Sequence, residues 1–225
     1  MTVLPRALLW RRTDTIGAEF VVLDDRRGLV ARGYATADEP VPYACRYELF
    51  TDEDWVSARF EATVEGAGWL RTARLERAAG RWRVTTAEQG DLDAAARAAG
   101  HPAQPLPGSE DPDRLGTALD LDLWASPLTN TLPVRRLDLR HAAPGTVHTI
   151  TAAWILLPSL AVVAGEQTYT VLPGGGVRYA SDGFTADLAL DEDGYVVHYP
   201  GLAERPSRGP NARSASASEP RDRTK

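Results

Sequence analysis

The sequence has almost no cysteine and almost no lysine. Cys45 is the only cysteine of the 225 residues, so an intrachain disulfide and a zinc site built from several cysteines are both excluded. A single thiol fits a reducing compartment, and we expect a cytoplasmic protein. Lys225 is the only lysine, a bias from which we draw no function. The net charge of −6 creates no positive field, so nucleic acid is not an expected partner.

Long hydrophobic runs are also missing. The most apolar segment, residues 152–164, is shorter than the roughly 20 residues of a membrane-spanning helix and contains Pro158. Near the start, Pro5 and the pair Arg11-Arg12 interrupt the stretch where a signal peptide would have its apolar core. We therefore expect a chain that neither spans a membrane nor is secreted.

The common catalytic and metal-binding patterns are absent as well. The four histidines are scattered without paired spacing, so we expect no metal and no cofactor. No Gly-x-Ser-x-Gly nucleophile motif occurs. The run Gly174-Gly175-Gly176 lies between two strand-like segments, which indicates a hairpin loop rather than a phosphate-binding loop.

Asp120 and Asp122 are the one candidate pair of acid–base residues. They alternate along a strand-like run, but nothing nearby in the sequence completes an acid–base site. We interpret them as a solvated strand face, and we expect a protein that is not an enzyme.

Short β-rich runs separated by turn residues fill most of the chain, a pattern typical of an antiparallel meander. Val41, Cys45 and Leu49 share one face of such a run, for example, while Ala44 and Arg46 lie on the other. Asp182-Gly183 and Asp193-Gly194 have the composition of two-residue hairpin turns. The expected strands cover residues 20–23, 29–36, 41–49, 55–64, 69–77, 81–86, 134–140, 147–157, 160–163, 166–172, 177–180, 184–190 and 195–199.

The β pattern breaks between Gly90 and Arg114. An Ala-rich stretch, residues 92–99, predicts a short helix, and the prolines that follow predict a loop that is functional or disordered, with disorder favoured. From residue 203 onward the near absence of apolar residues predicts a disordered tail. We therefore expect one β domain over residues 1–202, with an insertion at 90–114 and a tail at 203–225.

The segment 147–157 is apolar on both faces. Ala153 and Ile155 lie on one face, whereas Ile150, Ala152 and Trp154 lie on the other. Because one face of an antiparallel sheet usually meets water, such a strand is either covered by two packed layers or lines an apolar cavity. The sequence leaves both interpretations open.

Several blocks of the chain resemble the bacterial Putative glycolipid-binding family. They are residues 121–137, 153–169 and 183–202, together with Trp10-Arg11-Arg12-Thr13-Asp14 and Cys45-Arg46-Tyr47. The resemblance implies an all-β fold: a single curved antiparallel sheet, or half-barrel, similar in shape to the periplasmic carriers of lipoproteins, with an apolar concave face.

The resemblance also implies a set of ligand-binding residues. Carried over position by position, and with Trp154 added from the doubly apolar strand, they are Trp10, Arg11, Arg46, Tyr47, Thr129, Asn130, Arg135, Arg136, Trp154, Gln167, Tyr169 and Tyr199. Asn130 belongs to either a turn or the rim of a groove. Arg135 and Arg136 lie on opposite faces of their expected strand, so at most one faces a groove.

Three functions remain. The leading hypothesis is non-catalytic binding of an amphiphile, a glycolipid or lipid, on the concave face, with Arg and Tyr holding its polar head. The alternative is a protein–protein interaction module with a packed interior, and the third is a small hydrolase-like enzyme. A pocket of about 300 Å³ or more separates the first from the second, whereas a perturbed Asp or His in a closed polar cleft favours the third.

Overall fold

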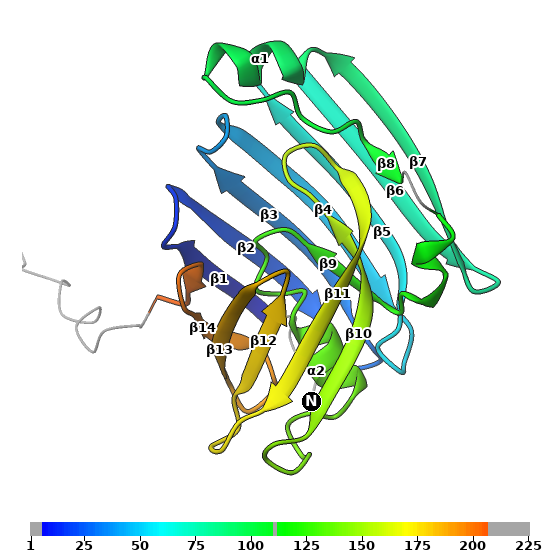
Figure 1. Cartoon of the computed structure of the whole chain (residues 1–225), viewed down its shortest axis with the longest axis vertical. Helices are drawn as coiled ribbons and strands as arrows, with labels where there is room; N and C mark the ends of the chain where they lie inside the picture. The colour runs from blue at the N-terminus through cyan, green and yellow to red at the C-terminus, as the bar shows by residue number, and fades with distance from the viewer. Residues whose placement is uncertain (1–5, 110–111, 207–225) are drawn as a thin grey trace, which may run out of the picture.

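One curved, open β-sheet makes up most of the molecule (Figure 1). The computed structural model describes residues 6–109 and 112–206, and within them fifteen strands belong to this sheet. The strand order is β7-β6-β5-β4-β3-β2-β1-β15-β14-β13-β12-β11-β10-β9, and β8 pairs with β11. The predicted curved all-β fold is confirmed. Two pairings, β9 with β10 and β8 with β11, are parallel, so the sheet is mixed rather than wholly antiparallel.

The first seven strands form a regular antiparallel meander. They are β1 (Arg6–Arg12), β2 (Gly17–Asp24), β3 (Val30–Ala37), β4 (Tyr43–Thr51), β5 (Ser57–Gly66), β6 (Trp69–Ala78) and β7 (Arg81–Gly90). The expected alternation is present on β4, where Cys45 and Leu49 are buried while Ala44 and Arg46 are exposed. Alternation of this kind turns one face of the meander into the wall of the main core.

The rest of the chain is less regular. Its elements are α1 (Leu92–Ala98), β8 (Gly108–Ser109), the 3-10 helix η1 (Arg114–Thr117), β9 (Asp120–Leu123), α2 (Thr131–Arg136), β10 (Val147–Ile155), β11 (Ala161–Val171), β12 (Val177–Ser181), β13 (Phe184–Leu190), β14 (Val196–Tyr199) and β15 (Ala203–Glu204). Strands β10 to β13 lie across the front of the meander in Figure 1. The expected strands 160–163 and 166–172 are one continuous strand, β11.

The expected strand 134–140 is wrong, because its first residues form helix α2. Pro133 stands in the first turn of this helix, where its fixed φ is favourable and a missing N–H costs nothing. The end of the helix is closed by backbone hydrogen bonds from Leu137 N to Pro133 O at 3.0 Å and from Leu139 N to Val134 O at 3.0 Å. Local apolar–polar alternation over four residues does not distinguish this turn of helix from a strand.

Strand β1 was not predicted, and it joins the two ends of the domain. It pairs with β2 on one side and with β15 on the other, where Arg11 lies opposite Glu204. Ala203 in β15 is fully buried, so the expected tail begins later than residue 203. The remainder of that tail, residues 207–225, lies outside the described residues.

The insertion packs against the sheet. Helix α1 confirms the expected helix, with the Asp91 side chain accepting a hydrogen bond from Ala94 N at 2.8 Å. Beyond it, the buried Arg71 guanidinium donates to Pro105 O at 2.6 Å and to Ser159 O at 3.2 Å. The expectation of disorder in the loop after this helix is therefore wrong for residues 100–109, while residues 110 and 111 are not described.

The far end of the sheet folds back onto the meander. Ser57 N donates to Leu119 O at 2.9 Å, and the Ser57 hydroxyl accepts from Leu121 N at 3.0 Å. The Trp82 indole donates to Ala118 O at 3.0 Å. The main hydrophobic core is enclosed between this returning segment and the meander.

Candidate ligand pocket

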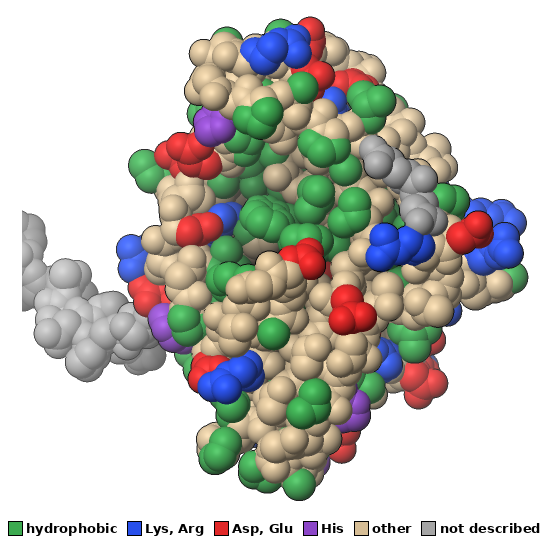
Figure 2. All heavy atoms as spheres, in the orientation of Figure 1, with side chains coloured by type: hydrophobic (Ala, Val, Ile, Leu, Met, Phe, Trp, Pro, Cys, Tyr) green, Lys and Arg blue, Asp and Glu red, His purple; other side chains and the backbone are tan. Residues whose placement is uncertain are grey.

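A cavity of about 370 Å³ opens beside the doubly apolar strand. Figure 2, in the same orientation as Figure 1, shows hydrophobic side chains gathered in a hollow near the middle of the visible face. Five separate parts of the chain supply the lining: the β1–β2 turn, β9 with its connection to α2, β10, the β12–β13 hairpin, and the end of β14 with the turn that follows it. The lining residues are Asp14, Asp122, Trp124, Ala125, Ser126, Asn130, Trp154, Tyr179, Ser181, Asp182, Phe184, Tyr199, Gly201 and Leu202.

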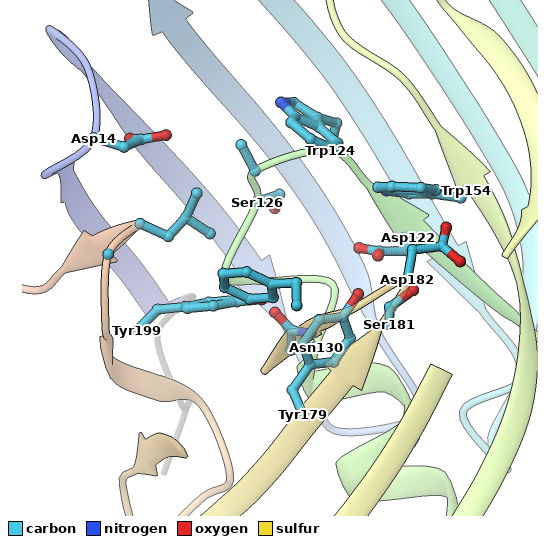
Figure 3. Close-up of a pocket in the computed structure, with 14 residues that line it drawn as sticks. Asp14, Asp122, Trp124, Ser126, Asn130, Trp154, Tyr179, Ser181, Asp182 and Tyr199 are labelled. Carbon is cyan, nitrogen blue, oxygen red and sulfur yellow. The ribbon is translucent and has the colours of Figure 1, made fainter. Parts of the chain in front are cut away.

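Aromatic side chains form two walls of the cavity. Trp124 and Trp154 pack with ring centroids 5.3 Å apart, and Tyr179, Phe184 and Tyr199 contact one another at 6.2 Å. Figure 3 shows the tryptophan pair on one side and the two tyrosines on the other, with Ser126 between them. Walls of this kind offer flat apolar faces together with a few polar atoms.

Two tight turns place these walls. Trp124 follows β9 directly, and its backbone N–H donates to Ile155 O at 2.8 Å. This hydrogen bond sets the Trp124 indole beside Trp154. The next residue, Ala125, has a φ of +61°, a strained value for a residue with a side chain. The Asp182-Gly183 turn has positive φ at both residues, as the predicted two-residue hairpin requires, and it places Phe184 at the cavity.

Asp122 lies at the base of the cavity, where it accepts two hydrogen bonds. Thr129 Oγ1 donates to one carboxylate oxygen at 2.7 Å, and Gln167 Nε2 donates to the other at 2.6 Å. The Asp122 residue is only 8% exposed. Burial therefore raises the pKa of Asp122 to about 6, although both hydrogen bonds oppose the shift.

A buried chain of hydrogen bonds continues from Gln167. Asn130 Nδ2 donates to the Tyr169 hydroxyl at 3.0 Å, and that hydroxyl donates to Gln167 Oε1 at 3.3 Å. All three side chains are at least 96% buried. The chain fixes the orientation of Asn130, the only one of the three that lines the cavity.

Ser126 connects the cavity to the meander. Its hydroxyl donates to Glu19 Oε1 at 2.6 Å, and the Tyr47 hydroxyl donates to the same oxygen. Gly33 makes this arrangement possible, because a Cβ there would lie 2.0 Å from the Tyr47 ring. Burial raises the pKa of Glu19 to about 7, so this carboxyl is protonated far more readily than an exposed one.

The interpretation of Asp120 and Asp122 as a solvated strand face is wrong. Both are buried, and Asp120 is held by Arg136, whose Nε donates to Asp120 Oδ1 at 3.0 Å and whose Nη2 donates to Oδ2. The partners all lie outside strand β9: Arg136 holds Asp120, and Thr129 and Gln167 hold Asp122. No pattern within the strand itself reveals them.

The predicted binding residues separate into three groups. Asn130, Trp154 and Tyr199 line the cavity. Directly behind the lining, Thr129 and Gln167 hold Asp122, Tyr169 holds Asn130, and Tyr47 shares the Glu19 carboxylate with Ser126. The remaining five, Trp10, Arg11, Arg46, Arg135 and Arg136, have no place in the lining.

Those five side chains have other partners or face solvent. Trp10 is fully buried and its indole donates to Val196 O at 2.8 Å. Arg11 is exposed and pairs with Glu204, and Arg46 is exposed on β4. Arg135 stacks over the Trp55 ring at 4.4 Å, while Arg136 pairs with Asp120. Since both arginines lie on a helix, the argument from opposite strand faces does not apply to them.

Sequence reasoning missed the larger part of the lining. Trp124, Tyr179 and Phe184 supply aromatic wall, and Asp122 supplies the polar base. Trp124 and Asp122 belong to the family-like block 121–137, so that block carried a signal. Phe184 belongs to the family-like block 183–202 in the same way, whereas Tyr179 lies in no such block and a hairpin turn alone does not indicate a binding site.

Residues 6–109 and 112–206 also lack two other features. Those residues contain no cluster of three or more His, Cys, Asp or Glu side chains that could hold a metal ion. None of the helices among them has the length and apolar character that crossing a membrane requires.

A curved, open β-sheet with an aromatic-walled cavity defines the class of this protein, and comparison with known proteins gives its family. The model of the Putative glycolipid-binding family matches residues 7–205, so the chain belongs to that family. A crystal structure of a DUF1089 family protein from Pseudomonas aeruginosa is similar, with 29% sequence identity and a TM-score of 0.62 over 91% of this chain and 100% of that one. No curated protein matches the sequence.

Proposed function

We propose that this protein binds an amphiphilic ligand, a lipid that carries a sugar, and that it does so without catalysis. The observation that carries the proposal is the cavity of about 370 Å³ with aromatic walls and a few fixed polar groups at its base. Apolar walls with a small number of oriented polar groups are typical of small-molecule sites. The description of the family supports the same class of ligand.

The arrangement around Trp154 favours a binding role over an interaction module with a packed interior. On one face of β10, Ala153 and Ile155 are buried in the main core. On the other face Trp154 remains half-buried and lines the cavity. A cavity above about 300 Å³ is large enough for a small-molecule ligand.

A hydrolase-like activity is the second candidate, and Asp122 is the observation that favours it. A carboxyl with a pKa raised to about 6 by burial, at the base of a pocket, resembles a general acid or base. Both of its oxygens, however, already accept hydrogen bonds from Thr129 and Gln167. We propose that Asp122 binds the polar part of the ligand as a hydrogen-bond acceptor and takes no part in a reaction. Turnover of an aryl glycoside by the purified chain, abolished in Asp122→Asn, would establish the catalytic role instead.

We also propose a cytoplasmic location. The one thiol, Cys45, is buried in the core and has no disulfide partner, as is usual for proteins of a reducing compartment.

Native mass spectrometry with lipid extraction tests the binding role. The full chain, purified from its source under mild conditions, should carry a co-purified amphiphile, and added dodecyl maltoside should raise its melting temperature. Absence of any bound amphiphile, together with an unchanged melting temperature, would contradict the proposal.

A matched pair of phenylalanine variants assigns the binding to the cavity. Phe184, 47% exposed, lines the pocket, while Phe20, 40% exposed on β2, does not. Phe184→Ala should reduce the ligand-induced rise in melting temperature, and Phe20→Ala should retain it. Equal responses of the two variants would place the ligand elsewhere.

A further inference from the structure

The formal charges on the side chains that line the cavity are all negative. Three carboxylates contribute to the lining: Asp14 after β1, Asp122 on β9 and Asp182 in the β12–β13 turn (Figure 3). No arginine, lysine or histidine is among the lining residues. The sequence-based expectation that arginine side chains hold the polar head of a ligand therefore finds no support in this geometry.

Two arginines close to lining residues in the chain or in space, Arg12 and Arg136, are each paired with a carboxylate. Arg12 donates to both carboxylate oxygens of Asp14, at 2.7 and 2.6 Å. Arg136 makes a two-pronged contact with Asp120, behind the cavity. A negatively charged ligand would have to draw one of these guanidinium groups away from its carboxylate.

The polar groups at the base of the cavity have mostly acceptor atoms left for a ligand. The proton of the Ser126 hydroxyl is directed to Glu19, which leaves the Ser126 oxygen as an acceptor. The Asp122 carboxylate accepts two hydrogen bonds and retains further lone pairs. Asn130 uses one N–H on Tyr169 and keeps its side-chain oxygen and its second N–H, so it can both accept and donate. A ligand that satisfies this base must bring donors.

We infer that the cavity selects an uncharged headgroup rich in hydroxyls, such as a glycosyl group, and rejects phosphate, sulfate and carboxylate headgroups. This inference rests on the proposed binding function and names the class of ligand for the same pocket. Sugar hydroxyls donate to Asp122, Ser126 and Asn130, while the C–H faces of the ring lie against the tryptophan and tyrosine walls. An anionic head meets repulsion from Asp122 and Asp182 in a partly dehydrated site.

Isothermal titration calorimetry with two probes of equal chain length tests the selection. Dodecyl maltoside and dodecyl phosphate are each titrated into the full chain below their critical micelle concentrations. We expect the glycoside to bind at least about tenfold more tightly than the phosphate. Equal or tighter binding of the phosphate overturns the inference and leaves the binding function in place. Failure of both probes to bind overturns the binding function and the inference with it.

Charge-removing variants show whether the carboxylates cause the selection. Asp182→Asn keeps the shape of the side chain, and Asn tolerates the φ of +43° at this turn. We expect it to narrow the preference for the glycoside severalfold. Asp122→Asn should narrow the preference further and weaken glycoside binding, because it removes an acceptor.

Asp187→Asn is the matched control. Asp187 lies on β13, is exposed and pairs with Arg178 away from the cavity, so the variant changes the net charge by the same amount. It should keep the wild-type preference. An unchanged preference in Asp182→Asn, or an equal loss in Asp187→Asn, would show that the lining carboxylates do not set the selection.

Discussion

The sheet has a regular half, the meander β1–β7, and an irregular half, the strands from β8 onward with the segments between them. The two halves differ in how many polar side chains they bury. Of the eleven buried polar side chains among the described residues, eight lie between Asp120 and Gln167, in the half that supplies most of the cavity. The meander β1–β7 contains the other three, Glu19, Ser57 and Arg71. Burial of polar groups costs free energy unless each finds a partner, so their concentration in one half indicates where function rather than stability has shaped the sequence.

The three buried polar side chains of the meander all reach the other half. Glu19 accepts a hydrogen bond from Ser126, Ser57 contacts β9, and Arg71 binds the backbone at Pro105 and Ser159. The regular half therefore buries polar groups where it meets the irregular half. The comparison teaches that long-range polar contacts hold the pocket-bearing half onto a hydrophobic meander.

The largest expected effect is the loss of the buried ion pair in the irregular half. Arg136→Met leaves Asp120, whose side chain is 2% exposed, without its partner. We expect the free energy of unfolding to fall by about 3–5 kcal/mol, measured by urea denaturation, because an uncompensated charge remains in the interior.

Two comparisons show whether burial causes this effect. Arg178→Met breaks the exposed pair with Asp187 and should lower the free energy of unfolding far less than Arg136→Met does, because solvent screens that pair. The double variant Asp120→Leu/Arg136→Met should recover much of the loss, since no charge is left unpaired. Similar losses in Arg136→Met and Arg178→Met would refute the contrast between the two sites.

The pH dependence of stability tests the contact between the halves at Glu19. Burial raises the pKa of Glu19 from 4.5 to about 7, so between these values the folded chain holds a proton that the unfolded chain has released. The free energy of unfolding therefore decreases as the pH rises from about 4.5 to about 7. Asp122 adds a decrease of the same sign, because burial raises its pKa from 3.8 to about 6.

Glu19→Gln removes the first of these contributions. Between pH 5 and pH 8 its free energy of unfolding should decrease by about 2 kcal/mol less than that of the wild type, measured by urea denaturation at each pH. Glu61→Gln, at an exposed position of β5, is the control and should behave like the wild type. An unaltered pH dependence in Glu19→Gln would show that Glu19 does not carry the linkage.

The smallest change in the free energy of unfolding is expected for a substitution in the cavity wall. The same substitution should clearly weaken ligand binding. Trp124 is 42% exposed, so Trp124→Ala should change the free energy of unfolding by under about 1 kcal/mol. Affinity for dodecyl maltoside should fall about tenfold, because one ring of the tryptophan wall is lost. Tyr34→Ala, at a 53% exposed position of β3, should leave affinity unchanged. Loss of binding in both variants would point to a general effect of aromatic removal.

The same contrast explains what the sequence predicts and what it does not. In the meander, alternation of apolar and polar residues sets each strand, and β4 and β6 follow it closely. The bounds of β13 agree with the predicted range 184–190, since Asp182-Gly183 marks its start. Strand β1 alternates too, with Leu9 and Arg11 exposed and Trp10 buried, but its arginines obscured the pattern.

The polar part of the site depends on contacts between distant residues. Asp122 receives its hydrogen bonds from Thr129 and Gln167, the latter 45 positions away, and Ser126 binds Glu19 across 107 positions. No local pattern encodes such pairs, so the burial of Asp122 was not predicted. Asn130, Trp154 and Tyr199 were predicted as binding residues and do line the cavity, whereas the arginines chosen as head-group ligands do not.

The seam between β1 and β15 has a consequence for how the molecule is made. Thr13 N donates to Leu202 O at 2.9 Å, and Asp14 and Leu202 both line the cavity beside this seam. Since a ribosome releases the amino-terminal strands first, the meander can assemble during translation. The cavity cannot form at that stage, because the segment after β14, which supplies one of its sides, is synthesised last among the lining segments. In a nascent chain the meander can therefore fold well before the ligand-binding cavity is complete.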